Sequence, residues 1–179
     1  MSKLLVGGIV CAFLGLVLYV VGIVTTAWLS VAYQQLGLWQ LCVTYLGGTH
    51  CIAAAGISLL PAAFNATRAF AVIGLVLFFP GLIAACVSAK KNYEEGICGV
   101  LEGAIYAKSY TIAPGICGAL AGAIYAGYAK SYALAPGVSV PFGFSFYLMW
   151  LQALFTIGGG SVIASTGSAS SDARVDAEG

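Results

Sequence analysis

An uncharged apolar run near the N-terminus most constrains this chain. No charged residue lies between Leu4 and about Ala27, and about 20 apolar residues are enough to cross the ~30 Å core of a bilayer. The chain as a whole is 61% hydrophobic and 7% charged, whereas soluble domains carry roughly 25% charged residues. A secretory signal peptide has a shorter apolar core and a small-residue cleavage site. We therefore expect a retained membrane anchor in an integral membrane protein.

Three further segments read as spans. The second is expected at about 69–89, between Arg68 and the Lys90–Lys91 pair. The third is expected at about 111–129. The fourth, about 142–164, opens with the aromatic-rich stretch FGFSFYLMW, which is typical of a membrane–water interface. The connections at about 28–68 and 130–141 would then lie together on one side of the membrane.

The third span is complicated by a tandem duplication. GICGVLEGAIYA recurs almost unchanged as GICGALAGAIYA, beginning at Gly96 and at Gly115. Copy one contains Glu102 and is soon followed by Lys108, which leaves its uncharged run too short to span. We therefore place the span in copy two and treat 96–114 as an insertion before it, either a helical extension or an interfacial helix. If both copies spanned, the C-terminus would change sides.

Basic residues beside the spans predict the orientation. Lys3, Lys90 and Lys91 lie on one side, against Arg68 and Lys130 on the other. This slight excess predicts a multi-pass plasma-membrane protein with both termini in the cytoplasm. The small, polar segment 167–179 is expected to be a disordered cytoplasmic tail.

Two of the six cysteines fall in the first outer loop. Cys42 and Cys51 lie in an oxidising location, with no other cysteine outside to pair with, which predicts a disulfide closing a hairpin. The alternative is a metal site formed with His50, although a fourth ligand is not evident. Cys86 and Cys98 fall near the inner face, where they are either small packing residues or sites of lipidation.

The residues around that loop favour strands. WLSVAYQQLGLWQLCVTYL is rich in β-branched, aromatic and leucine residues, and LGGT is a turn signal. We expect a small antiparallel sheet on the outer membrane surface, pinned by the disulfide, with Trp28 and Trp39 at its base.

Glycines mark helix faces that pack closely. Gly8, Gly15 and Gly22 recur every seven residues, which predicts a face packed inside the bundle. Gly118 and Gly122 form a G-x-x-x-G pair, for which both dimerisation and packing within the bundle remain open.

The remaining sequence features argue against catalysis, nucleic-acid binding and transport. The chain has one histidine, no phosphate-binding loop and no carboxylate pair inside a span, so neither an enzyme nor a cofactor is expected. The net charge of +1 excludes an electrostatic nucleic-acid binder. Four spans with almost no charge inside them serve a transporter poorly.

One motif resembles a known family. Trp28, then Gly37-Leu38-Trp39, then Cys42 and Cys51, then Arg68 at the start of the second span, is similar to the W…GLW…C…C…R pattern of claudins. Claudins belong to a wider superfamily of four-span proteins that includes the peripheral myelin and epithelial membrane proteins. The resemblance implies a four-transmembrane-helix bundle topped by a β-sheet from the first outer loop. It also implies lateral assembly into strands, homo-oligomeric contacts, and contacts with an opposing cell at junctions.

Several features differ from the claudin pattern. The stretch from Trp28 to Gly37 is shorter, which trims the first hairpin and favours the myelin-protein branch. The first outer loop has no carboxylate, so nothing in it supports a carboxylate-lined cation pore. Arg68 is expected to act as an anchor or carbonyl-binding group, with anion preference as the alternative. The leading hypothesis is an adhesion or paracellular barrier component. The alternative is a membrane organiser or auxiliary subunit of another membrane protein.

Overall fold

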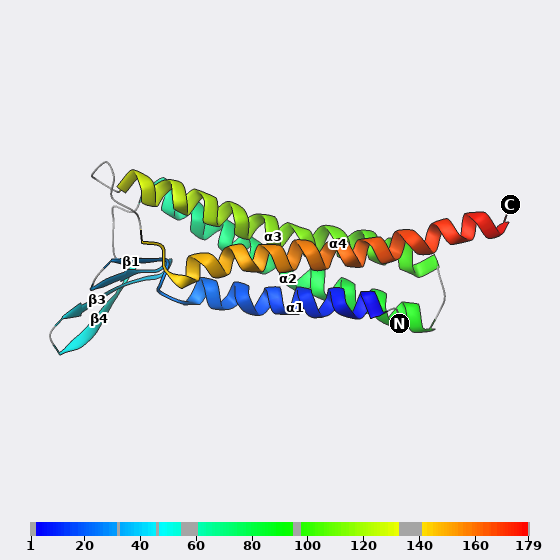
Figure 1. Ribbon diagram of the computed structural model, residues 1–179, viewed down its shortest axis with the longest axis horizontal. Helices are drawn as coiled ribbons and strands as arrows, with labels where there is room; N and C mark the ends of the chain where they lie inside the picture. The colour runs from blue at the N-terminus through cyan, green and yellow to red at the C-terminus, as the bar shows by residue number, and fades with distance from the viewer. Residues whose placement is uncertain are drawn as a thin grey trace.

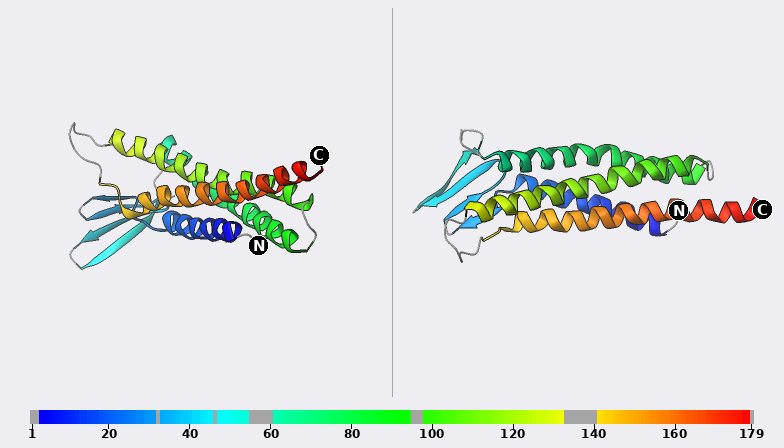
Figure 2. Two further views of the ribbon diagram at one scale, coloured as in Figure 1. Left: turned by 45° about the vertical axis from the view of Figure 1, so that its right-hand side comes forward. Right: turned by 90° about the horizontal axis from the view of Figure 1, so that it is seen from above.

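The structure is a computed structural model that describes residues 3–31, 33–45, 47–54, 61–94, 98–132 and 141–178. Within these residues, four long helices run side by side with a small sheet at one end of the bundle (Figure 1). The helices are α1 (Lys3–Val24), α2 (Ala62–Glu94), α3 (Cys98–Tyr132) and α4 (Phe144–Glu178). Two further views keep the sheet at the same end, which we call the sheet end (Figure 2).

Each helix contains a stretch long and apolar enough to cross a membrane: Val6–Val24, Ala62–Ile83, Ile112–Ser131 and Phe144–Ile163. The predicted fold class is therefore confirmed. α1 ends at Val24, a few residues earlier than expected, because the chain turns there into the sheet. α2 begins at Ala62, so Arg68 lies inside the second helix instead of bounding it.

The side chains are sorted as a bilayer requires. The bundle-facing residues of α1 include small ones, such as Ala12 and Gly15, while its other faces expose large aliphatic and aromatic side chains. A soluble helix would bury the large residues. In lipid the large residues can face the acyl chains, and small residues let the helix backbones approach closely.

The predicted packing glycines lie against neighbouring helices. A Cβ on Gly8, Gly15 or Gly22 would come within 2.5 to 3.1 Å of the side chain of Ile163, Thr156 or Met149 of α4. The G-x-x-x-G pair of α3 also faces α4: Gly118 lies under the Gln152 amide, and a Cβ on Gly122 would lie 3.2 Å from the indole nitrogen of Trp150. These contacts favour packing within the bundle over dimerisation for this pair.

Polar groups also tie the helices together inside the bundle. The Tyr19 hydroxyl donates to the carbonyl of Ala71 at 2.9 Å, and its ring meets that of Phe78 edge-on at 5.4 Å. Nearer the sheet end, the hydroxyls of Thr25 and Ser145 lie 2.7 Å apart and join α4 to the residue that follows α1. Hydrogen bonds between helices in a membrane contribute about 0.6 kcal/mol each on average. Packing therefore remains the larger source of stability.

The duplicated segment continues one helix. α3 is 35 residues long and contains Pro114, so copy one from Cys98 onward is a helical extension of the third span. A proline is tolerated in a membrane helix when neighbouring helices and side chains satisfy the backbone groups that it frees.

The prediction of a disordered tail is wrong. α4 is 35 residues long and continues to Glu178, so 167–178 is helical. The segment contains no proline, and Gly167 is its only strong helix-weakening residue before the end. Extending an existing helix avoids the cost of nucleating a new one, which outweighs the polar composition on which the prediction rested.

The predicted sheet is present between α1 and α2. Its strands, β1 (Leu29–Val31), β2 (Gln34–Leu36), β3 (Gln40–Tyr45) and β4 (Gly48–Ala53), are antiparallel and neighbour one another in chain order. The turn before β4 places Gly47 at a φ of 118°, which glycine adopts without strain.

Candidate assembly surface at the sheet end

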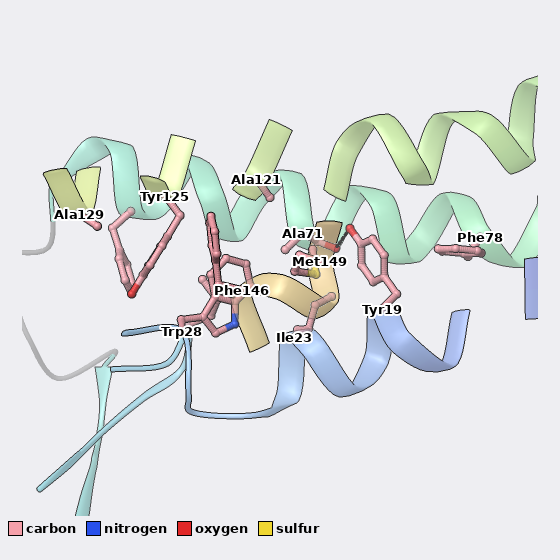
Figure 3. Packing of buried hydrophobic residues seen from close by; sticks show 12 residues of the cluster. Tyr19, Ile23, Trp28, Ala71, Phe78, Ala121, Tyr125, Ala129, Phe146 and Met149 are labelled. Atoms are coloured by element: carbon pink, nitrogen blue, oxygen red, sulfur yellow. Dashed lines mark hydrogen bonds between the residues drawn. The ribbon is translucent and has the colours of Figure 1, made fainter. Parts of the chain in front are cut away.

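Trp28 anchors the sheet to the helices. Its side chain is fully buried, and the indole N–H donates to the carbonyl of Gly22, near the end of α1, at 2.8 Å. Its ring meets Tyr125 of α3 and Phe146 of α4 edge-on, with centroids 4.9 and 6.4 Å apart (Figure 3). Satisfying the indole N–H makes the burial of so large a side chain favourable, and Trp28 thereby joins the start of the sheet to three helices.

The Gly37-Leu38-Trp39 turn forms the second attachment. Leu38 is fully buried, and a Cβ on Gly37 would lie 2.6 Å from the Cα of Thr26. Only glycine therefore lets the turn approach the segment that follows α1. Trp39 was expected at the base of the sheet but is 40% exposed. It lies at the edge of the base, whose interior is occupied by Trp28 and Leu38.

Arg68 holds this turn from α2. Its Nε–H donates to the carbonyl of Leu38 at 2.7 Å. The guanidinium lies over the rings of Phe64 at 4.7 Å and Trp39 at 5.4 Å. This geometry matches the expected carbonyl-binding role. Among the described residues, the Nη2 atom has no hydrogen-bond partner. Because the aromatic faces and the carbonyl stabilise the charge, the helix continues through Arg68, which explains why the second span begins earlier than predicted.

The segment before α4 closes one edge of the sheet. The Ser30 N–H donates to the carbonyl of Pro141 at 3.0 Å, and Leu29 forms an isolated bridge with Phe142. The next residue, Gly143, donates its N–H to the Trp28 carbonyl at 3.0 Å, and a Cβ there would collide with the Ala27 carbonyl. Sequence reasoning missed this contact, although a glycine placed between two phenylalanines was a signal of close backbone approach.

The disulfide between Cys42 and Cys51 is present and joins directly opposed residues of β3 and β4. The prediction is confirmed, and the metal-site alternative is wrong because both sulfurs are bonded to each other. His50 is exposed and pairs with Val43. Since neighbouring residues in a strand point to opposite faces, His50 lies on the face away from the disulfide.

The two faces of the sheet differ in chemistry. The strand register places Gln35, Gln40, Thr44 and Thr49 on the disulfide face. The other face is mainly apolar, and among its members Tyr45 is 70%, Ile52 55% and Val31 47% exposed. No Asp, Glu, Lys or Arg lies anywhere in the sheet, and the one titratable histidine, His50 of β4, is on the apolar face. Leu29 and Leu36, also on the apolar face, pack against the bundle core, so this face runs from the core out to an exposed surface.

Among the described residues, nothing pairs with the far edge of the sheet. Every residue of β4 is exposed, and β4 pairs only with β3 among the described strands. The N–H of Thr44 donates to the carbonyl of Tyr33 on the β2 side, at 2.7 Å. Thr49, opposite Thr44, therefore directs its own backbone groups away from the sheet, because facing residues alternate between bonded and non-bonded pairs. An open row of N–H and C=O groups is a template for another strand.

Four helices long enough to span, with a disulfide-pinned sheet held by a tryptophan and an arginine, define a four-span membrane protein with a sheet domain at one end. A model of the PMP-22/EMP/MP20/Claudin family matches residues 1–163. The chain belongs to this family, as the resemblance predicted. The side chains of Cys86, Cys98 and Glu102 lie outside the described part of the structure.

Proposed function

We propose that this chain is a non-enzymatic adhesion or barrier component that assembles side by side in the plasma membrane, with the sheet outside and both termini in the cytoplasm. The observation that carries the proposal is the open β4 edge beside an uncharged, apolar sheet face. The attachments at Trp28 and Arg68 fix this surface rigidly to the membrane anchor, which lowers the entropy lost when two copies meet.

The proposed contact joins β4 of one copy to β4 of another. Antiparallel pairing of the same strand is self-complementary, so one patch serves both partners. Main-chain hydrogen bonds would supply the pairing, and apolar side chains such as Ile52 would meet across it. The sheet contains no Asp, Glu, Lys or Arg, so two identical sheets meet without the repulsion between these side chains that charged surfaces suffer.

The same surface favours a seal over a cation pore. The outer connections contain no carboxylate, and their charged residues are limited to Arg68 and Lys130. Of these, Arg68 is occupied by the Leu38 carbonyl and two aromatic rings. Apolar and amide side chains meeting between two cells would exclude water and ions without attracting cations.

One observation favours the alternative, a membrane organiser or auxiliary subunit like the myelin and epithelial membrane proteins. β1 and β2 are only three residues each, so the first hairpin offers little surface to an opposing cell. This limits the contact between cells more than the lateral contact through β4.

Freeze-fracture of cells expressing the protein separates the two functions. Continuous intramembrane strands where cells touch would support the adhesion and barrier proposal. Dispersed particles would contradict it, and co-purification of a larger membrane protein would then favour the auxiliary function.

Thr49→Pro tests the edge itself. Proline removes the outward N–H of Thr49, while the bonds between β3 and β4 do not use that group. We expect shortened or absent strands in freeze-fracture, with unchanged surface expression and an intact disulfide. Thr49→Ala is the matched control, because it removes the same hydroxyl, 3.2 Å from that of Thr44, and keeps the N–H. Strands of equal length in both variants would rule out assembly through this edge.

A further inference from the structure

The duplication gives α3 two candidate segments for one place in the bundle. The two 12-residue copies begin 19 positions apart and differ at two positions. Nineteen helical residues rise about 28 Å, close to the ~30 Å core of a bilayer. Sliding α3 by one repeat would therefore exchange one copy for the other across the whole membrane. The two registers are discrete, because a smaller slide of α3 would place neither copy in the position that copy two occupies in the bundle.

Much of the packing surface of copy two is repeated in copy one. Seven positions between Ile112 and Ser131 are buried. Four of them have the same residue 19 positions earlier: Gly115 and Gly96, Gly118 and Gly99, Gly122 and Gly103, and Tyr125 and Tyr106. The Gln152 amide over Gly118 and the Trp28 ring beside Tyr125 would thus find the same partner residues in copy one.

The other three buried positions separate the copies. Ala121 corresponds to Glu102, Ala129 to Tyr110 and Pro114 to Glu95. Ala121 has no exposed surface and lies near the middle of the candidate span Ile112–Ser131, and Ala129 is only 4% exposed. Both alanines face the core cluster (Figure 3). Pro114 is close to the end of the span, where a carboxylate in its place could still reach water.

We propose that Glu102 and Tyr110 act as a register lock, which keeps copy one out of the bundle and commits copy two to the third span. In the slipped register Glu102 would occupy the Ala121 site at mid-membrane, which disfavours that register on the order of a hundredfold. Tyr110 would occupy the Ala129 site, where the closely packed core has no volume for a phenol ring. Lys108 contributes less than Glu102, because it would replace Gly127, an exposed position with nothing within 4 Å that lies four residues before the end of the span, where a lysine can extend its ammonium to the interface.

The chain has natural reporters for this choice. Cys98 and Cys117 occupy the same position in the two copies. In the observed register Cys117 lies inside the bundle, 3.0 Å from the place of a Cβ on Gly74. Replacing Cys11 and Cys86 by serine leaves these two as the free thiols, since Cys42 and Cys51 are bridged.

The test is thiol labelling of the full chain inserted into sealed microsomes, with a maleimide-polyethylene glycol added before and after opening the vesicles with digitonin. The parent chain is expected to label at Cys98 and to protect Cys117 throughout. Glu102→Ala with Tyr110→Ala should raise labelling of Cys117 at least tenfold above that background. Adding Ala121→Glu and Ala129→Tyr should invert the pattern, with Cys117 labelled and Cys98 protected in most chains. Single Cys98→Ser and Cys117→Ser versions assign each labelled band.

Val100→Ala is the matched control. The two copies differ at one other position, where copy one has Val100 and copy two has the half-buried Ala119. It should leave the parent pattern unchanged. The lock is refuted if the four-site exchange still protects Cys117 and labels Cys98, or if Val100→Ala alone shifts the pattern. The labelling pattern reports which copy of the repeat lies in the membrane, even in a variant whose helices do not pack correctly. The readout is also independent of whether the sheet mediates adhesion.

Discussion

Trp28 and Arg68 transmit the position of the helices to the sheet. The Trp28 N–H donates to a carbonyl of α1, and the Trp28 ring packs against aromatic rings of α3 and α4. Arg68 reaches from α2 to the carbonyl of Leu38. Each residue combines one directed hydrogen bond with aromatic contacts, so together they fix both the distance and the orientation of the sheet relative to the bundle.

Trp28→Phe should therefore be more damaging than its conservative nature implies. Phenylalanine keeps part of the packing but leaves the Gly22 carbonyl without its buried donor, at a cost of about 1–3 kcal/mol. Trp28→Ala adds a cavity and should lower the free energy of unfolding by about 3–5 kcal/mol.

The measurement is unfolding in detergent micelles with rising SDS. Trp150→Phe is the control for the loss of ring size, since Trp150 is 41% exposed on α4 and packs against Gly122 and Phe146, and it should cost less stability than Trp28→Phe. Equal effects of Trp28→Phe and Trp150→Phe would mean that the bond to Gly22 contributes nothing.

The sequence predicted some of these residue contacts and not others. The outer location of Cys42 and Cys51 predicted the disulfide, and the W…GLW…C…C…R spacing predicted the family, because those residues act through their own chemistry. It did not give the partner of Trp28, the helical setting of Arg68 or the contact of Gly143 with Ala27. Each of these depends on atoms brought together from distant parts of the chain.

At the scale of elements, the disulfide staples two strands that have few other restraints. All residues of β4 are exposed, and its other attachments among the described residues are the ladder to β3, the Thr44–Thr49 hydroxyl contact and the Ala54–Trp39 hydrogen bond that follows. A bridge with a sequence separation of 9 removes about 2–3 kcal/mol of loop entropy from the open state.

Replacing Cys42 and Cys51 together by serine should loosen the β3–β4 hairpin and leave the helices intact. We expect faster hydrogen exchange at 40–53, by roughly 30–100-fold, and unchanged exchange in α1 and α4. Cys11→Ser, which removes a free thiol in α1, is the control. Unchanged exchange in the hairpin would show that its pairing suffices without the bridge.

Element boundaries were predictable to the extent that charge and hydropathy set them. The spans in α3 and α4 agree with the sequence to within a few residues, since their ends coincide with polar or aromatic boundaries. The start of α2 and the helical tail of α4 did not follow from composition. The charge of Arg68 is stabilised by the Leu38 carbonyl and two aromatic rings, and the tail continues a helix that the membrane span has already nucleated.

In the whole molecule, the bundle is held by close approach between neighbouring helices, and α1 with α4 is one of the large contacts, beside α2 with α3 and α3 with α4. The glycines of α1 face Ile163, Thr156 and Met149 along the length of the contact. In lipid no hydrophobic force drives helices together, so the contact depends on shape. The sheet, attached at the ends of these helices, inherits its position from that fit.

Gly15→Val should consequently separate α1 from α4 and disturb the sheet from a distance. A Cβ there would lie 2.5 Å from the Thr156 side chain and 3.4 Å from its backbone nitrogen, so the helices must move apart. We expect a loss of about 1–3 kcal/mol in SDS unfolding, together with faster hydrogen exchange at 37–41, because the pocket for Trp28 is shared by α1, α3 and α4. Gly7→Val provides the matched control in the same helix, since a Cβ on Gly7 meets nothing within 4 Å. If Gly15→Val destabilised the helices without changing exchange at 37–41, the sheet would be positioned by α2 and α3 alone, through Arg68 and Tyr125.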